Sequence, residues 1–302
     1  MDHTSPVAEA TRSRLVARFG AAVGPWWARL PGMVDDLAAR WDLVVGEPVG
    51  RGNTSLVLRC RRGDGRRAIL KLTPDPRLCG AEALVLGAWR SSGRVPLLWG
   101  CDAALGALLL EAIPDETPLA QRPGGVALGD VAELIGALHR TGVPAVGDGV
   151  VSLADRVQFV FAHWIERHGR DPAVASLVPG RRLERGRELA RRLAAGGGAR
   201  VLLHGDLHPG NVLHGGAPRG LVAIDPRPCV GDPAFDAVDW VFWRAEHPDA
   251  WAGRSRQLAT ALDCDHERLW SWCAAFAAML AAGKAARGEA PGEVGALLAL
   301  AP

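Results

Sequence analysis

Two residue types are almost missing from this chain, and the few that remain become informative. Of its 302 residues 35 are basic, yet the only lysines are Lys71 and Lys284, and the only asparagines are Asn53 and Asn211. Lysine presents a compact ammonium group, whereas arginine presents a planar fork. A lysine that persists in an arginine-rich chain therefore indicates a position where the chemistry needs a point charge.

Several functional classes lack their signatures in this sequence. The formal net charge is +2 and the basic residues are dispersed, so nothing indicates a nucleic-acid partner. No signal-peptide segment opens the chain, and no run approaches the roughly 18 apolar residues of a membrane span. The six cysteines stand singly without Cys-x-x-Cys spacing, which disfavours a zinc site or a disulfide framework. We expect a cytoplasmic monomer without a nucleic-acid or membrane partner.

The N-terminal part combines helices with a strand-rich region. Residues 8–40 have helical periodicity, with breaks at Gly24-Pro25 and Pro31-Gly32. Short β-prone runs then alternate with turns, around one helix at about residues 79–90. The strands are expected near residues 43–45, 56–58, 68–72, 94–99 and 105–113. Together they predict an antiparallel five-stranded sheet with one helix.

Proline and glycine cluster at residues 114–125, which predicts a linker or hinge. Helical periodicity dominates beyond this segment. The helices are expected at residues 127–140, 152–168, 181–195, 233–246 and 251–285. We therefore predict an α+β chain with an N-terminal lobe over residues 1–113 and a mainly helical C-terminal lobe over residues 126–302.

A glycine-rich turn at residues 50–55, GRGNTS, separates the first two expected strands. Gly50 and Gly52 permit a tight turn and leave backbone amides, up to Ser55, accessible to phosphate oxygens. A dinucleotide fingerprint is disfavoured, because a strand and not a helix follows the turn. An ordinary hairpin loop remains the alternative.

Lys71 ends the third expected strand, where its ammonium group suits pairing with nucleotide phosphates. A solvated strand lysine is the alternative. Glu82 lies on the same helical stripe as Val85 and Leu86 and therefore faces inward. An inward carboxylate needs a cation, and Lys71 is the nearest one in the sequence, although Glu82 could instead interact with the helix dipole.

The strongest signal is the loop HGDLHPGN at residues 204–211, which follows a short apolar strand. A predicted hairpin leads from this loop to Asp225, so Asp206, Asn211 and Asp225 are expected at one sheet edge. Phosphoryl transfer needs such a group: Asp206 to accept the proton of the attacking hydroxyl, and Asn211 and Asp225 to hold Mg²⁺. The alternative is that these Asp and Asn side chains only stabilise turns. That explanation suits a single residue better than three residues that converge on one site.

Three neighbouring polar residues are interpreted as structural. His204 follows an apolar strand, and we expect a buried imidazole that bonds the loop backbone. Asp232, followed by Pro233, has the pattern of a helix N-cap. Asp236 is then placed to turn inward and hold the loop.

These motifs resemble the aminoglycoside phosphotransferase family, most of all its streptomycin 6-phosphotransferase branch, which includes enzymes that act on hydroxyurea. The resemblance covers roughly residues 40–285 and rests on the 204–211 loop, on Ile224-Asp225 and on residues 231–233, GDP. It implies a bilobal protein-kinase-like fold, with ATP and Mg²⁺ as cofactors. It also implies that Glu111 to Ile113 form the hinge whose backbone binds adenine.

The resemblance implies an ATP-dependent O-phosphotransferase that acts on an aminoglycoside, with streptomycin 6-phosphorylation and antibiotic resistance as the leading expectation. Protein substrates are disfavoured, because the Asp-Phe-Gly of protein kinases is replaced at residues 225–227 and no activation segment is found. A metabolic kinase for homoserine, choline or a sugar remains an alternative. A catalytically silent nucleotide-binding module is the other, although the intact Asp206 and Lys71 argue against it.

A cationic substrate requires carboxylates in its pocket. Between Asp225 and Asp265, eight acidic residues outnumber four arginines. Glu246 and Asp249 are the candidates for this cation site, and a solvated acidic face is the alternative explanation. If neither residue binds the substrate, the helical segment before the catalytic loop is the next place to search. Its candidates are Asp155, Glu166 and Asp171.

Overall fold

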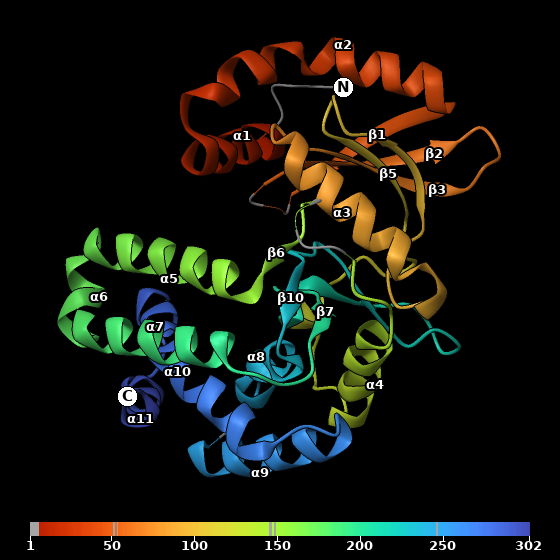
Figure 1. Ribbon diagram of the computed structural model, residues 1–302. Coiled ribbons are helices and arrows are strands. Elements are labelled where there is room, and N and C mark those ends of the chain that lie inside the picture. The colour runs from red at the N-terminus through yellow and green to blue at the C-terminus, as the bar shows by residue number, and fades with distance from the viewer. Residues whose placement is uncertain (1–5, 51, 53, 145–146, 148, 246) are drawn as a thin grey trace. The chain divides into compact units, whose positions relative to one another are not determined.

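The computed structural model describes residues 6–50, 52, 54–144, 147, 149–245 and 247–302. The chain divides into two compact units, residues 1–116 and 117–302, which can be followed by colour along the chain in Figure 1. The division falls inside the proline- and glycine-rich segment 114–125.

Unit 1 is a five-stranded antiparallel sheet with helices on both faces. The strand order is β1-β2-β3-β5-β4. All five predicted strands are present, although the fourth lies a few residues after the predicted range 94–99. Their bounds are Leu43–Val49 (β1), Leu56–Arg62 (β2), Arg67–Leu72 (β3), Leu98–Asp102 (β4) and Ala107–Glu111 (β5). The helices are α1 (Pro6–Phe19), α2 (Val23–Trp41) and α3 (Pro76–Ala88).

The two faces of β3 contact different helices. Side chains alternate across a strand, so Leu70 and Leu72 share one face, where they are buried in a core with Leu30 and Leu37 of α2. Lys71 lies on the opposite face, where it reaches α3. The strand period thus directs a single charged residue away from the main core.

The helix breaks predicted at Gly24-Pro25 and Pro31-Gly32 are wrong, because α2 runs through both. Pro25 lies in the first turn, where a backbone N–H has no helical partner to lose. Pro31 lies inside the helix and carries a cost of about 3 kcal/mol. Burial of Leu30 and Leu37 offsets that cost and keeps the helix continuous.

Unit 2 is mainly helical and carries two small sheets. Its helices are α4 (Leu128–His139), α5 (Leu153–Gly169), α6 (Pro172–Leu177), α7 (Gly180–Ala195), α8 (Val238–Phe242), α9 (Pro248–Ala261), α10 (His266–Ala286) and α11 (Pro291–Leu300). Its strands are β6 (Val151–Ser152), β7 (Val201–Leu203), β8 (Val212–His214), β9 (Leu221–Ala223) and β10 (Cys229–Gly231). They form a sheet of order β6-β10-β7 and a β8-β9 hairpin.

Helix α10 forms the centre of unit 2, packed against α7, α9 and α11 (Figure 1). Within the part of the chain that the structure describes, it is the one helix long and apolar enough to cross a membrane. Most of that apolar stretch is buried inside the unit, including Leu269, Trp272 and Phe276. Its apolarity is therefore accounted for by core packing.

Two of the predicted helices are interrupted in the structure. Residues 233–246 do not form one helix: a 3₁₀ segment at Pro233–Ala237 precedes the short α8, because tertiary hydrogen bonds fix the Asp236 carboxylate there. Residues 251–285 form two helices, α9 and α10, since Asp263 adopts a left-handed φ of 50° and Asp265 caps α10. Local periodicity detects neither interruption.

Candidate active site

The catalytic-loop candidate, residues 204–211, connects β7 to β8. Gly205 has a φ of +75°, and a Cβ atom there would lie 2.0 Å from the carbonyl oxygen of Arg227. Only glycine tolerates both the left-handed backbone and this close approach. The turn at Gly205 thus determines where the next residue, Asp206, projects.

Asp236 holds the start of this loop, as the sequence predicted. Its Oδ2 accepts a hydrogen bond from the His204 amide (2.8 Å), and its Oδ1 accepts one from the Gly205 amide (2.9 Å). His139 Nε2 of α4 lies 3.1 Å from Oδ2. Burial alone would raise the pKa of Asp236, but these hydrogen bonds and the neighbouring histidines lower it below its usual value. An ionised carboxylate therefore fixes the loop backbone.

Asp232 and His204 also have the structural roles that were predicted. Asp232 caps the 3₁₀ segment by accepting from the Ala234 amide, and its carboxylate also contacts Arg268 and Trp272 of α10. His204 is fully buried. Burial lowers the pKa of His204 to about 4, so its neutral ring donates from Nε2 to the Ile224 carbonyl at 3.0 Å.

The β8-β9 hairpin brings the remaining loop residues together. Val212 pairs with Ala223, and the Ile224 amide donates to the Asn211 carbonyl at 2.9 Å. Asn211 and Asp225 therefore flank the same end of the hairpin. Asn211 Nδ2 donates to the carbonyl oxygen of Asp206 (3.0 Å) and lies 3.3 Å from its Oδ2. Asp206, Asn211 and Asp225 thus lie together at one end of the β8-β9 hairpin.

Asp225 is one of four non-glycine residues with positive φ among those that the structure describes, at 57°. Aspartate adopts this left-handed conformation more readily than most residues. Such backbone geometry persists where the surrounding structure determines it. Here the ladder of β9 and the Ile224–Asn211 hydrogen bond supply that constraint.

The donor set suits a hard divalent cation. The Asn211 amide nitrogen is committed to Asp206, which leaves its Oδ1 as an oxygen ligand beside Asp225. Mg²⁺ is usually bound by one or two protein oxygens together with substrate phosphates. Among the described residues no group of three or more His, Cys, Asp or Glu is placed to hold a metal ion.

Arg156 of α5 is a site residue that the sequence analysis missed. Its Nη2 donates to Asp206 Oδ1 at 3.0 Å and its Nε donates to the Gly205 carbonyl at 2.9 Å. Burial lowers the pKa of its guanidinium group, an effect that Asp206 opposes. The sequence offered one indication of this role. Arg156 follows Leu153 by three residues and adjoins Val157, and both of these apolar residues are buried, so its side chain lies near the buried face of α5.

In unit 1, Lys71 and Glu82 form the ion pair that the helical stripe predicted. Lys71 Nζ lies 2.7 Å from Glu82 Oε1 and 2.6 Å from Oε2. Each residue is 5% exposed. Burial strengthens the attraction between the two groups and makes either one costly to leave unpaired.

The glycine-rich turn joins β1 to β2, and two of its residues, Arg51 and Asn53, lie outside the described part of the chain. Gly52 has a φ of +106°, and Ser55 is buried. Arg14 of α1 donates from Nε to the Gly52 carbonyl (3.0 Å) and from Nη2 to the Gly50 carbonyl (3.3 Å). Helix α1 therefore supports the turn, which the sequence did not indicate.

The hinge and substrate candidates are more dispersed. Glu111 ends β5, where its amide donates to the Leu97 carbonyl and its Oε2 accepts from the Leu97 amide. Ile113 is buried within unit 1. Glu246 lies outside the described residues, and Asp249 is exposed in the first turn of α9.

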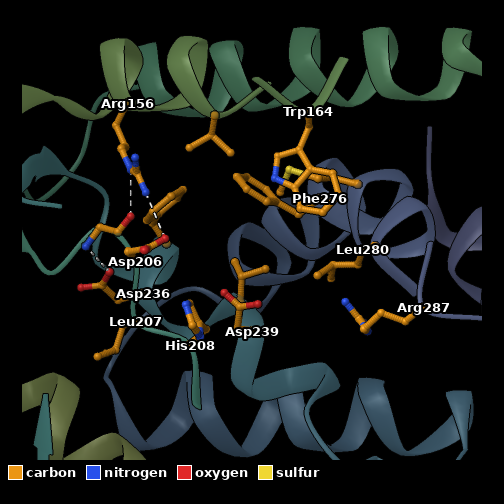
Figure 2. Close-up of a pocket in the computed structure, with 16 residues that line it drawn as sticks. Arg156, Trp164, Asp206, Leu207, His208, Asp236, Asp239, Phe276, Leu280 and Arg287 are labelled. Carbon is orange, nitrogen blue, oxygen red and sulfur yellow. Dashed lines mark hydrogen bonds and ion pairs between the residues drawn. The ribbon is translucent and has the colours of Figure 1, made fainter. Parts of the chain in front are cut away.

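A cavity of about 280 Å³ opens beside the catalytic-loop candidate within unit 2. Figure 2 shows Arg156, Asp206 and His208 on one side of it. Trp164, Phe276 and Leu280 lie on the other side, and Asp239 lies between the two groups. Asp249 does not line this cavity. The cavity therefore adjoins the carboxylate that was predicted to act as the base.

The fold of this chain is similar to the folds of several solved small-molecule kinases. The chain is similar to an aminoglycoside phosphotransferase, APH(4)-Ia, with a TM-score of 0.59 and 17% identity over 90% of this chain and 99% of that one. It is also similar to the choline kinase LicA from Streptococcus pneumoniae, with a TM-score of 0.59 and 13% identity over 86% and 91% of the two chains. These likenesses confirm the predicted bilobal kinase-like fold.

Sequence comparison narrows the family. The chain is 38% identical over 227 residues to a hydroxyurea phosphotransferase of Kitasatospora aureofaciens, a match that covers 73% of this chain and 64% of that relative. It is 33% identical over 265 residues to a streptomycin 6-kinase of Streptomyces griseus, which covers 85% and 83% of the two chains. A profile of aminoglycoside/hydroxyurea antibiotic resistance kinases matches residues 40–288. This chain therefore belongs to the aminoglycoside/hydroxyurea antibiotic resistance kinase family.

Proposed function

We propose that this protein transfers the γ-phosphoryl group of ATP to a hydroxyl group of an aminoglycoside antibiotic, with streptomycin phosphorylated at its 6-position and thereby inactivated. The observation that carries the proposal is the grouping of Asp206, Asn211 and Asp225 at one end of the β8-β9 hairpin. The similarity to streptomycin 6-kinases supports the choice of substrate. Cytoplasmic ATP would supply the phosphoryl group.

Within unit 2, Asp206 acts on the acceptor. Its carboxylate orients the substrate hydroxyl and accepts the proton as the oxygen attacks phosphorus. Arg156 holds Oδ1 of this carboxylate and so fixes the direction of the remaining lone pairs. Asn211 and Asp225 would hold Mg²⁺, which neutralises charge on the nucleotide phosphates when bound.

Within unit 1, the nucleotide is bound by backbone and by one buried cation. Lys71 would contact the α- and β-phosphates while Glu82 holds its ammonium group in place. Amides of the turn at Gly50, Gly52 and Ser55 would cover the phosphates. The segment from Glu111 to Ile113 would bind adenine.

Release of ADP tests the proposal directly. The purified protein is incubated with Mg²⁺-ATP and with streptomycin, hydroxyurea, choline or homoserine, one at a time, and ADP and the phosphorylated product are measured. We expect ADP release that depends on streptomycin and stops when EDTA removes Mg²⁺. ADP release with choline or homoserine alone would indicate a metabolic kinase, and none with any acceptor would indicate a silent nucleotide-binding module.

Hydroxyurea is the second candidate acceptor, favoured by the 38% identity to a hydroxyurea phosphotransferase. The same panel separates the two candidates, because kcat/KM is measured for each acceptor under identical conditions. A higher kcat/KM for hydroxyurea than for streptomycin would replace streptomycin as the proposed substrate and leave the kinase chemistry unchanged.

A further inference from the structure

The cavity beside Asp206 has the dimensions of a site for one ring. Its volume is about 280 Å³, just below the roughly 300–1,000 Å³ of most ligand pockets. All of its lining residues belong to unit 2. The side chains that line the cavity therefore determine which part of an acceptor lies next to the Asp206 carboxylate.

Three aspartates line this cavity, and two of them are committed elsewhere. Asp206 is bonded to Arg156, and Asp236 is bonded to loop amides and to His139. Asp239, in the first turn of α8, differs from both. Its carboxylate has no hydrogen bond or ion pair with any residue that the structure describes.

The two arginines of the cavity wall are engaged by groups other than Asp239. Arg156 is engaged by Asp206 and Gly205, and Arg287, at the far end in Figure 2, pairs with Glu289 at 2.6 Å. Burial raises the pKa of Asp239 to about 6, with Asp206 and Asp236 adding to the effect and His208 opposing it. An anion in such surroundings is stabilised strongly by a cation that enters the cavity.

The apolar side of the cavity also suits a cation of a particular shape. The rings of Trp164 and Phe276 lie across the cavity from the loop residues (Figure 2). Aromatic faces attract ammonium and guanidinium groups, and arginine-like planar groups stack on them. Arg167 already lies over the Trp164 ring, 5.1 Å from its centroid, so this ring accepts a guanidinium group in the structure. With Asp239 between these rings and the loop residues, the cavity suits a guanidinium-bearing ring.

We propose that Asp239 binds a guanidinium or ammonium group of the acceptor in this cavity, so that a polyhydroxylated cationic ring lies against Trp164 with one of its hydroxyl groups at Asp206. This inference rests on the proposed function and adds the residue that selects a cationic acceptor. It assigns that role to a cavity residue in place of the exposed Asp249.

Two ring compounds provide a direct test in the absence of turnover. Streptidine, the guanidinium-bearing ring of streptomycin, and scyllo-inositol, a neutral ring of the same size, are titrated into the protein by calorimetry. We expect streptidine to bind and scyllo-inositol to bind at least tenfold more weakly. Equal binding of the two rings would overturn the inference, because charge would then have no role in the site.

Substitutions test whether Asp239 is the carboxylate that binds the cation. Asp239→Asn should raise the KM for streptomycin and the Kd for streptidine by about 10- to 100-fold, the range for a lost charged hydrogen bond, with the KM for ATP unchanged. Trp164→Leu should raise the same two constants by a smaller factor. Asp130→Asn, an exposed aspartate of α4 away from the cavity, is the matched control and should change neither.

The outcomes separate this inference from the proposed function. If no acceptor is phosphorylated by the unmodified protein, the proposed function fails. If streptomycin is phosphorylated but Asp239→Asn leaves its KM unaltered, only the inference fails. A raised KM in Glu246→Gln or Asp249→Asn, without one in Asp239→Asn, would return the cation site to the start of α9.

Discussion

The Lys71–Glu82 pair in unit 1 and the catalytic-loop group in unit 2 both depend on buried charge, but the two are built differently. The pair joins two residues that are 11 positions apart, on a strand and the helix that follows it. The loop group joins residues that are up to 97 positions apart, from His139 to Asp236. Elements adjacent in the sequence form the first, and the packing of the whole unit forms the second.

The difference determines how each site tolerates change. The ion pair holds one cation against one carboxylate, so a change in either partner acts directly on the other. The loop group distributes its contacts: Asp236 fixes the backbone, Arg156 fixes the carboxylate of Asp206, and Asn211 fixes the end of the hairpin. A single substitution in the supporting residues should therefore weaken catalysis without abolishing it.

The largest effect is expected at the centre of the loop group. Asp206→Asn removes the proposed proton acceptor and keeps the shape and the Arg156 contact, so kcat should fall by at least about 10²-fold. The melting temperature and ATP binding should stay near those of the unmodified protein. Turnover close to normal in the purified variant would contradict the role of Asp206 as the base.

The ion pair should be nearly as sensitive. Lys71→Arg keeps the charge but places a bulky fork in a space that holds an ammonium group 2.6 Å from Glu82, so kcat/KM for ATP should fall by about tenfold or more. The control is Lys284→Arg, the other lysine of the chain, which pairs with Glu289 and Glu293 and is more exposed. Equal activity of the two variants would show that Lys71 has no special role.

A supporting residue of the loop should show an effect smaller than that of Asp206→Asn. Arg156→Gln removes a charged hydrogen bond worth about 1.5–3 kcal/mol, so kcat should fall by about 10- to 100-fold, with little change in the KM for ATP. Arg156→Lys should recover part of the loss, because it restores the charge without the second contact to Gly205. Arg170→Gln, at an exposed surface ion pair of the same region, should leave kcat unaltered. Loss of ATP affinity in step with kcat would indicate a general structural effect instead.

The smallest effect is one of stability at the cavity. The pKa of Asp239 rises from 3.8 to about 6 in the folded protein, so the folded state binds the proton more tightly than the unfolded state. This contribution to stability is fully present below pH 3.8 and is lost as pH rises through about 6. Asp239→Asn removes this penalty, so it should stabilise the folded protein more at pH 7.5 than at pH 4. The difference between the two effects on the free energy of unfolding should be about 2 kcal/mol. Denaturant titration at both values checks this, and no difference between them would contradict it.

The sequence predicted those residues whose positions depend on elements that are adjacent in the chain. Strand alternation placed Lys71, helical spacing turned Glu82 towards it, and the hairpin after Asn211 returned the chain to Asp225. The N-cap pattern identified Asp232 in the same way. Each of these conclusions depends on local geometry that a period of two or of 3.6 residues fixes.

Only the tertiary structure decided the rest. Arg156 reaches Asp206 across 50 positions, and Arg14 reaches the glycine turn across 38, distances over which no periodicity operates. The sequence shows that acidic residues are frequent after Asp225. Which of these carboxylates lines the cavity depends on the 3₁₀ segment that forms in place of the start of the predicted helix. Local rules determine the faces of strands and helices, whereas the packing of distant elements determines which side chains meet.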